Sequence, residues 1–330
     1  MSQAPTLSSR DLGLGLMGMT WRPDPIPTSE AIEVLRASVV AGCTLWNGAD
    51  FYGTRQYNSV HLLKAYFTKF PEDAIKVTVM IKGGVDPGTM KPDGSQEGIR
   101  RSVDNILASL EGIGNLNIIF CIARRDHSHP FDVTLKTIQR EYIDTGKLAG
   151  VAISECSKET VNEAARHVKV AAAEVELSIF TPDTLNNGVA AACKEHGIPI
   201  VAYSPIGRGM LTGRFTKASD YQYLGRIAGF PRLQDEAIRH NLKLVNQVET
   251  TAQKKGCTPA QLAVNWVRAL GKRADLPEVI PIPGATTVTR VEENAKVIEL
   301  GEEDMKVIDD LINNFDVYGT RYPSGVPVEL

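Results

Sequence analysis

The sequence has few cysteines and no long apolar run, and both shortages exclude classes of protein. Its five cysteines stand singly and form no Cys-x-x-Cys pair, which argues against a disulfide framework and favours reduced thiols inside an intracellular protein. No 18 apolar residues follow one another, so we expect no membrane-spanning helix. The opening residues MSQAPT lack a basic run followed by an apolar core. We therefore expect no signal peptide and a soluble, cytoplasmic protein that can also reach the nucleus.

The sequence also has little net charge. It contains 36 Lys and Arg against 39 Asp and Glu, a net charge of −3. A field this weak does not indicate binding to nucleic acid or to an anionic membrane, so we expect a small-molecule partner. Hydrophobic residues make up 43% of the 330 residues, enough to fill a large core. The sequence leaves the oligomeric state undetermined.

What the sequence does contain is a regular alternation of short apolar strands with helical patterns. Eight strand segments are each followed by a helical segment, and this number predicts an α/β fold, a (β/α)8 TIM barrel. An open doubly wound sheet of similar composition is the alternative. The expected strands are 11–19, 43–50, 75–82, 117–122, 148–153, 170–177, 198–203 and 279–282. The main expected helices are 28–40, 58–70, 96–110, 133–145, 157–167, 185–196, 234–255, 259–270, 291–297 and 302–313.

No shift in composition marks a second domain, so we expect a single barrel domain over residues 1–330. A long insertion, 207–231, follows the seventh expected strand. The final residues, 316–330, contain two prolines and two glycines and are interpreted as a covering tail.

The glycines Gly13, Gly15 and Gly18 match the Gly-x-Gly-x-x-Gly string of dinucleotide-binding folds. In those folds a helix begins within the motif and points its amide groups at a pyrophosphate. Here Pro23 and Pro25 follow instead, and they cannot continue a helix. The sequence therefore does not predict a Rossmann turn.

Three residues at the ends of neighbouring strands can carry chemistry together. Asp50 and Tyr52 follow the second expected strand, and Lys82 ends the third. The carboxyl ends of barrel strands meet on one face, so these side chains can converge. A tyrosine beside a buried lysine has its phenolate favoured by the positive charge, which suits protonation of a carbonyl oxygen. Each residue alone is equally well explained as a satisfied polar group at a strand end.

The chain resembles the aldo-keto reductase superfamily over nearly its full length, and within it the fungal pyridoxal reductases. The resemblance implies a barrel that binds a nicotinamide dinucleotide without a Rossmann domain. It is carried by several motifs in the right order: 15–21 (GLMGMTW), 46–53 (WNGADFYG), 82–83 (KG), 150–155, 202–209 (AYSPIGRG), 211–213 (LTG), 280–284 (IPIPG) and 292–294 (EEN).

The resemblance also implies roles for individual residues. Tyr52 would be the general acid, Lys82 would lower its pKa, and Asp50 would be the partner of Lys82. Ser154 and Glu174 match carboxamide ligands, although many members have glutamine at the second position. Tyr203 matches the aromatic residue that stacks on the nicotinamide. The other cofactor-binding residues implied are Met19, Thr20, Ser204, Ile206, Gly207, Arg208, Pro283, Gly284, Arg290, Glu293 and Asn294, and the substrate residues are Trp21 and Arg124.

Two departures from the family pattern stand out. The family's catalytic histidine should lie at Ala123, which has no polar side-chain atom; the fungal pyridoxal reductases resemble this sequence in lacking it. His127 and His129 could substitute from the loop, but an ordinary solvated loop explains them equally well, and no third ligand at suitable spacing indicates a metal site. Residues 285–287 (ATT) lack a lysine found in many NADP-preferring members, which leaves Arg290 as the main basic group for a 2′-phosphate.

The sequence thus favours an NADPH-dependent reductase that converts pyridoxal to pyridoxine. Two alternatives remain open. The first is a general aldehyde reductase, because loops decide the substrate. The second is a slow-turnover NADPH-binding redox sensor or channel-associated subunit on the same barrel, in which Asp50, Tyr52 and Lys82 would also be retained.

Overall fold

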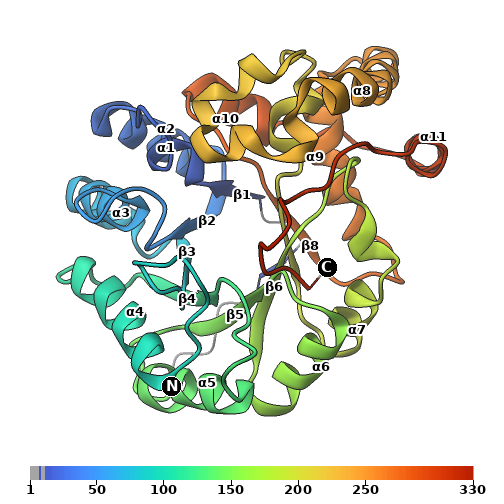
Figure 1. Ribbon diagram of the computed structural model, residues 1–330. Helices are drawn as coiled ribbons and strands as arrows, with labels where there is room; N and C mark the ends of the chain where they lie inside the picture. The colour runs from blue at the N-terminus through green and yellow to red at the C-terminus, as the bar shows by residue number, and fades with distance from the viewer. Residues whose placement is uncertain (1–6, 9–11, 330) are drawn as a thin grey trace.

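The structure is a computed structural model that describes residues 7–8 and 12–329. Eight parallel strands pair in the order β1 to β8 and form a barrel with helices around its outside (Figure 1). Asp11, the first residue of the first expected strand, lies outside the described residues. The strands are β1 Leu12–Gly15, β2 Cys43–Ala49, β3 Thr78–Gly83, β4 Asn117–Ile122, β5 Gly150–Ser154, β6 Val170–Glu176, β7 Ile200–Tyr203 and β8 Val279–Ile282.

The barrel closes between its last and first strands. The backbone amide of Gly15 donates to the carbonyl oxygen of Pro283 at 3.1 Å, and an isolated parallel bridge joins Gly15 to Gly284. An open sheet has no such contact, so the doubly wound alternative is wrong and the predicted (β/α)8 barrel is confirmed. The glycine string leads into a single turn, α1 Met17–Thr20, instead of a long phosphate-binding helix.

Helices connect the strands, and polar side chains fix where several of them begin. Asn58, Ser95 and Ser157 accept backbone N–H bonds at the starts of α3, α4 and α6, as is typical of N-caps. The longer helices are α2 Thr28–Val40, α3 Ser59–Lys69, α4 Gln96–Ser109, α5 Phe131–Ile138, α6 Lys158–His167, α7 Val189–Glu195, α8 Asp235–Lys255, α9 Pro259–Leu270, α10 Val288–Ala295 and α11 Glu302–Asn313. Shorter turns are η1 Pro71–Asp73 and η3 Asp183–Leu185.

Two expected helices differ in extent from the prediction, and a third, expected at 291–297, is shifted to Val288–Ala295. The helix expected at 185–196 begins only at Val189, because Gly188 has a left-handed φ of 91°. The helix expected at 133–145 begins at Phe131 and changes after Ile138 into a π-helical turn, η2 Gln139–Ile143. None of these differences alters the order of the strands.

Alternation along β2 and β3 decides which side chains reach the barrel interior. Side chains two residues apart lie on the same face of a strand, so Asn47 follows Leu45 and Lys82 follows Met80 toward the carboxyl end. Both are buried, with Asn47 3% and Lys82 5% exposed. The apolar cluster below them consists mainly of Leu45, Met80, Ile119, Cys121, Ala152, Val201 and Ile280.

Two segments lie over the carboxyl end of the barrel. The chain after β7 forms η4 Gly207–Thr212, η5 Ala218–Gly229 and η6 Pro231–Leu233. The last residues return across the barrel mouth (Figure 1), where the backbone amide of Ser157 donates to Glu329 Oε2 at 2.9 Å. Within the described ranges 7–8 and 12–329, the helices are too short or too polar to cross a bilayer.

Candidate active site

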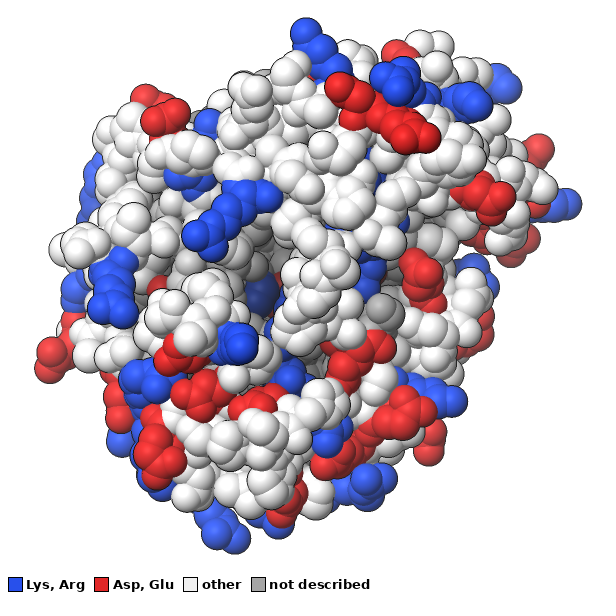
Figure 2. Space-filling view, in the orientation of Figure 1, with Lys and Arg blue, Asp and Glu red and all other residues white. Residues whose placement is uncertain are grey.

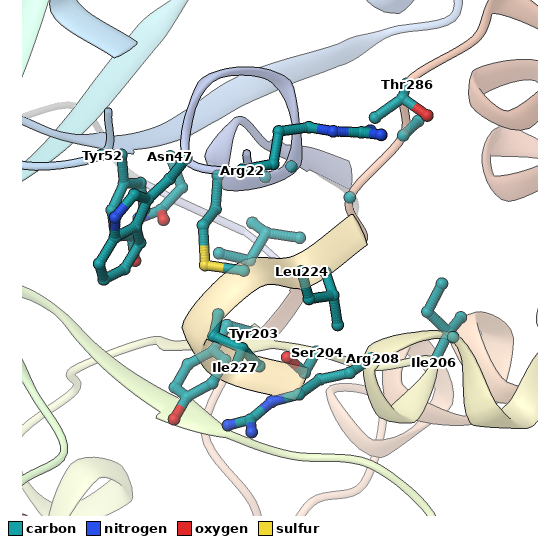
Figure 3. A pocket seen from close by; sticks show the side chains of 18 of the residues that line it. Arg22, Asn47, Tyr52, Tyr203, Ser204, Ile206, Arg208, Leu224, Ile227 and Thr286 are labelled. Atoms are coloured by element: carbon teal, nitrogen blue, oxygen red, sulfur yellow. The ribbon is translucent and has the colours of Figure 1, made fainter. Parts of the chain in front are cut away.

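A cavity of about 830 Å³ opens at the carboxyl ends of the strands. Figure 2 shows a hollow near the middle of this face with basic side chains inside it. The strands supply polar groups such as Asn47, Lys82 and Tyr203 to its wall. Leu224 and Ile227 of η5 add an apolar cover (Figure 3). The cavity therefore combines a few polar groups from the strands with an apolar cover, as is typical of small-molecule sites.

A buried lysine is held in a closed ring of polar contacts. The Lys82 ammonium donates to Glu174 Oε1 at 2.5 Å and to Asn47 Oδ1 at 2.6 Å. The Asn47 amide donates to Glu174 Oε2 at 2.8 Å. Burial alone would lower the pKa of Lys82, but the Glu174 carboxylate raises this pKa above its ordinary value. The lysine therefore keeps its charge at neutral pH.

Tyr52 lies beside this lysine. The Lys82 ammonium is 5.3 Å from the centroid of the Tyr52 ring, and the rings of Trp21 and Tyr52 stack with centroids 5.0 Å apart. Gly53 makes the turn that follows with a φ of 135°, where an added Cβ would lie 2.4 Å from the carbonyl oxygen of Tyr57. Burial raises the pKa of Tyr52, and Lys82 lowers this pKa as expected, but burial has the larger effect, so the phenol is protonated at neutral pH.

The expected pairing of Asp50 with Lys82 is also wrong. Asp50 Oδ2 accepts a hydrogen bond from the Ser102 hydroxyl of α4 at 2.6 Å, while the Lys82 ammonium contacts Asn47 and Glu174. The reason is strand alternation: Asp50 is three residues from Asn47 and so has the opposite parity. Asp50 and Lys82 are joined through the backbone instead, because the Asp50 amide donates to the Lys82 carbonyl oxygen at 3.0 Å.

The Asp50 carboxyl should affect stability in a pH-dependent way. Burial raises its pKa to about 6, against the ordinary value of 3.8. The folded state then holds this proton more tightly than the unfolded state, so stability falls as pH rises from about 4 to about 6. Asp50→Asn removes the charge. We expect its gain in free energy of unfolding to be near zero at pH 4 and about 1–3 kcal/mol at pH 7, measured by urea unfolding.

Asp86→Asn is the matched control, because hydrogen bonds from Thr89 lower the pKa of Asp86 instead. Asp86→Asn should therefore lower the free energy of unfolding, and this loss should appear as pH rises through the acidic range. A gain for Asp50→Asn that does not change between pH 4 and pH 7 would contradict the buried-carboxyl explanation.

A second group of charges holds Tyr203 and Arg208. The Tyr203 hydroxyl donates to Glu155 Oε1 at 3.0 Å and lies 2.6 Å from the hydroxyl of Tyr322 in the tail. The Arg208 guanidinium lies 3.3 Å from Glu176 Oε2. Arg208 therefore already has a carboxylate partner, and the tail contributes Tyr322 to the cavity wall.

Several polar groups in the wall lack a full set of partners. The Ser154 hydroxyl and Nε of Arg22 are buried without a hydrogen-bond partner among the described residues. The Arg290 guanidinium donates to Thr286 Oγ1 at 3.3 Å, and Arg22 extends toward Thr286 (Figure 3). Neither arginine has a carboxylate partner within 4.0 Å in the described part of the chain. Two such guanidinium groups fit an anionic part of a nucleotide.

The cavity wall contains most of the predicted ligand-binding residues and omits five. It contains Trp21, Tyr52, Lys82, Arg124, Ser154, Glu174, Tyr203, Ser204, Ile206, Arg208, Gly284, Arg290, Glu293 and Asn294. It omits Asp50, Met19, Thr20, Gly207 and Pro283.

Local packing explains why four of these residues do not line the cavity. Asp50 does not line it because its side chain lies on the opposite face from Asn47. Met19 is fully buried in the core, and the Thr20 hydroxyl donates to the Tyr52 carbonyl oxygen at 2.7 Å. Gly207 packs against Phe180. Pro283 accepts the closing hydrogen bond from Gly15. These four residues do not line the cavity, and their expected contacts with the cofactor stay a prediction.

Several residues of the cavity wall were not predicted from the sequence. Asn47 could have been found from alternation, because it is a polar residue on the same face of β2 as the inward-facing Leu45. Arg22, Tyr223 and Tyr322 line the cavity from irregular segments, for which the sequence pattern gives no orientation. His127 and His129 do not line it and are 67% and 43% exposed, so substitution by these loop histidines is wrong. The described residues contain no group of three or more metal-ligating side chains.

The fold and the site together define a TIM barrel with a protonated phenol beside a charged, buried lysine in a ligand-sized cavity. Residues 11–313 match the sequence model of the aldo/keto reductase family. The chain belongs to this family and is an oxidoreductase. A TIM-barrel glycerol dehydrogenase from Gluconobacter oxydans matches the fold with a TM-score of 0.78 at 21% identity, covering 96% of both chains.

Two yeast proteins are similar along nearly the whole sequence. "Probable pyridoxal reductase 2" of Schizosaccharomyces pombe is 36% identical over 318 residues, which cover 94% of each chain. "Putative pyridoxal reductase" of Saccharomyces cerevisiae is 32% identical over 335 aligned positions, covering 94% of this chain and 95% of the relative. The resemblance to fungal pyridoxal reductases is thereby confirmed.

Proposed function

We propose that this protein reduces pyridoxal to pyridoxine with NADPH as the hydride donor. The observation that carries the proposal is the protonated Tyr52 phenol, whose ring centroid lies 5.3 Å from the charged Lys82 ammonium inside the cavity. The names of the two yeast relatives support the choice of substrate. Aldo-keto reductases generally use NADP(H), which supports the choice of cofactor.

In the proposed reaction, bound NADPH supplies a hydride to the carbonyl carbon. Tyr52 donates its phenolic proton to the carbonyl oxygen as that oxygen gains negative charge. Lys82 stabilises the phenolate left on Tyr52. Glu174 and Asn47 hold the ammonium in place and keep it charged. Ala123, which follows β4, has no side-chain donor to offer the carbonyl oxygen.

The residues of the wall fit a nicotinamide dinucleotide. The Ser154 hydroxyl, which has no hydrogen-bond partner among the described residues, is suited to the carboxamide, and Tyr203 is suited to stacking on the nicotinamide. The turn from Ser204 to Arg208 would lie against the pyrophosphate. Arg290, joined by Arg22, would bind the 2′-phosphate in place of a lysine.

The proposal is tested by following NADPH absorbance with purified protein and pyridoxal, with pyridoxine identified by chromatography. We expect turnover with NADPH to exceed turnover with NADH at least tenfold in kcat/KM, since a phosphate–guanidinium contact contributes about 1.5–3 kcal/mol. Similar kcat/KM for pyridoxal, 4-nitrobenzaldehyde and simple ketones would favour a general aldehyde reductase instead. NADPH binding without oxidation by any carbonyl would contradict the enzyme and favour the redox-sensor alternative.

A further inference from the structure

Arg124 is a guanidinium in the cavity wall without a carboxylate partner in the described part of the chain. It donates to the carbonyl oxygen of Ala123 at 2.5 Å and weakly to the Tyr322 hydroxyl at 3.4 Å. A guanidinium has five N–H donors. These two bonds use only part of that capacity, and the side chain lines the cavity, with its guanidinium 5.6 Å from the centroid of the Tyr322 ring.

Three other cations of the barrel mouth are neutralised, whereas Arg22 and Arg290 elsewhere in the wall have no carboxylate partner in the described part of the chain. Lys82 contacts Glu174 at 2.5 Å, Arg321 contacts Glu155 at 3.1 Å and Arg125 contacts Glu163 at 2.8 Å. Arg124 differs from these three. A guanidinium with few partners in the wall of a cavity is suited to binding an anionic group of a ligand. The free protein therefore presents a site for an anion at this position.

Arg124 lies on the Tyr52 side of the cavity. It follows Ala123, whose amide donates to the carbonyl oxygen of Gly83, next to Lys82, at 3.0 Å. Burial would lower the pKa of Arg124, but the nearby Tyr322, Tyr203, Glu155 and Tyr52 raise it. Arg22 and Arg290 lie instead near Tyr223. The cavity thus has two separate cationic places, one suited to cofactor phosphate and one near the proton donor.

We propose that Arg124 binds an anionic oxygen placed next to the reacting carbonyl of the substrate, and thereby selects aldehydes with an ionised ortho substituent. The inference rests on the proposed function. Pyridoxal has this pattern, because its ring hydroxyl is adjacent to the aldehyde and ionises readily beside the ring nitrogen. A guanidinium on that oxygen would orient the aldehyde toward Tyr52, a task for which Ala123 has no polar atom.

The test compares Arg124→Gln with wild type on pyridoxal and on pyridine-4-carbaldehyde, which lacks the hydroxyl. A charge-assisted hydrogen bond in a desolvated site predicts a fall in kcat/KM of about 10- to 100-fold for pyridoxal. For pyridine-4-carbaldehyde we expect less than about threefold. Arg124→Lys, which keeps the charge, should recover part of the loss for pyridoxal. Equal losses for both aldehydes would overturn the proposal, because they would indicate a general disturbance of the site.

Arg125→Gln is the matched control. It removes the same charge one residue later, from a guanidinium bound to Glu163 and Thr160 and outside the cavity wall. Its ratio of kcat/KM between the two aldehydes should equal the wild-type ratio. A change as large as that of Arg124→Gln would count against a specific role for Arg124.

A second pair of substrates tests the role of Arg124 even if pyridoxal is not the substrate. If pyridoxal is not reduced but other aldehydes are, wild type should still prefer 2-carboxybenzaldehyde to 4-carboxybenzaldehyde, and Arg124→Gln should lose that preference. If no aldehyde is reduced, we expect the NADP+-loaded wild type to bind 2-carboxybenzaldehyde more tightly than 4-carboxybenzaldehyde, as measured by tryptophan fluorescence. Loss of that difference in Arg124→Gln supports the anion site, and the same difference in both proteins refutes it.

Discussion

A Tyr52→Phe variant is expected to reduce pyridoxal at about one hundredth to one ten-thousandth of the wild-type rate, with little change in NADPH affinity. A positioned general acid contributes this much to proton transfer. Phenylalanine keeps the ring that stacks on Trp21 at 5.0 Å and removes only the hydroxyl that donates the proton. The loss should fall mainly on kcat, because the phenol acts as charge develops on the carbonyl oxygen.

Tyr221→Phe provides a control for removing a buried tyrosine hydroxyl. Tyr221 is fully buried, its hydroxyl has no partner among the described residues, and it does not line the cavity. Its replacement should leave the rate within about twofold and the stability unchanged or slightly higher, since no hydrogen bond is lost. If Tyr52→Phe keeps the wild-type kcat and also the wild-type rate of hydride transfer in a single turnover, Tyr52 is not the proton donor.

The second large effect concerns the buried Lys82–Glu174 pair. Lys82→Met leaves the Glu174 carboxylate buried without its cation, and Glu174→Met leaves the ammonium without its anion. Breaking a buried pair on one side costs about 3–5 kcal/mol, so we expect each variant to lose that much free energy of unfolding. The double variant should lose at least about 2 kcal/mol less than the sum, because no lone charge remains. Urea unfolding of the four proteins measures the coupling.

Activity separates the electrostatic role of Lys82 from its structural role. The double variant regains stability but still lacks the ammonium beside Tyr52, so its kcat should stay as low as that of Lys82→Met. Recovery of both stability and rate would mean that the charge is not needed for proton donation. The exposed pair Lys272–Glu299, whose side chains are 66% and 76% exposed at 3.0 Å, is the control, and its cycle should show about 0–1 kcal/mol of coupling.

The strand pattern was enough to predict the barrel. Apolar segments such as 117–122 and 279–282 coincide with β4 and β8, because strands buried on both faces are continuous hydrophobic runs. The ends of helices were less accurate. Gly188 delays α7 through its left-handed φ, and a sequence pattern does not reveal that angle at a given glycine.

The site was predicted in part. Tyr52 and Lys82 meet as expected, since the ends of adjacent parallel strands lie together. The partner of Lys82 was wrong, because Asp50 points to Ser102 and Glu174 comes from a strand 92 residues further along the chain. The resemblance to the family placed Glu174 at the cofactor, whereas here its carboxylate binds the lysine.

The sequence by itself determined the class of fold, the family and the two residues proposed to move the proton, because hydrophobic period and local motifs are properties of neighbouring residues. Only the tertiary structure decided which charges are paired. Glu174 neutralises Lys82, Glu176 contacts Arg208, and Arg124 lacks a carboxylate partner among the described residues. The physical reason is that ion pairing depends on distances of a few ångströms between side chains from different strands and from the returning tail. Closure of the barrel fixes those distances, and the order of residues along the chain does not.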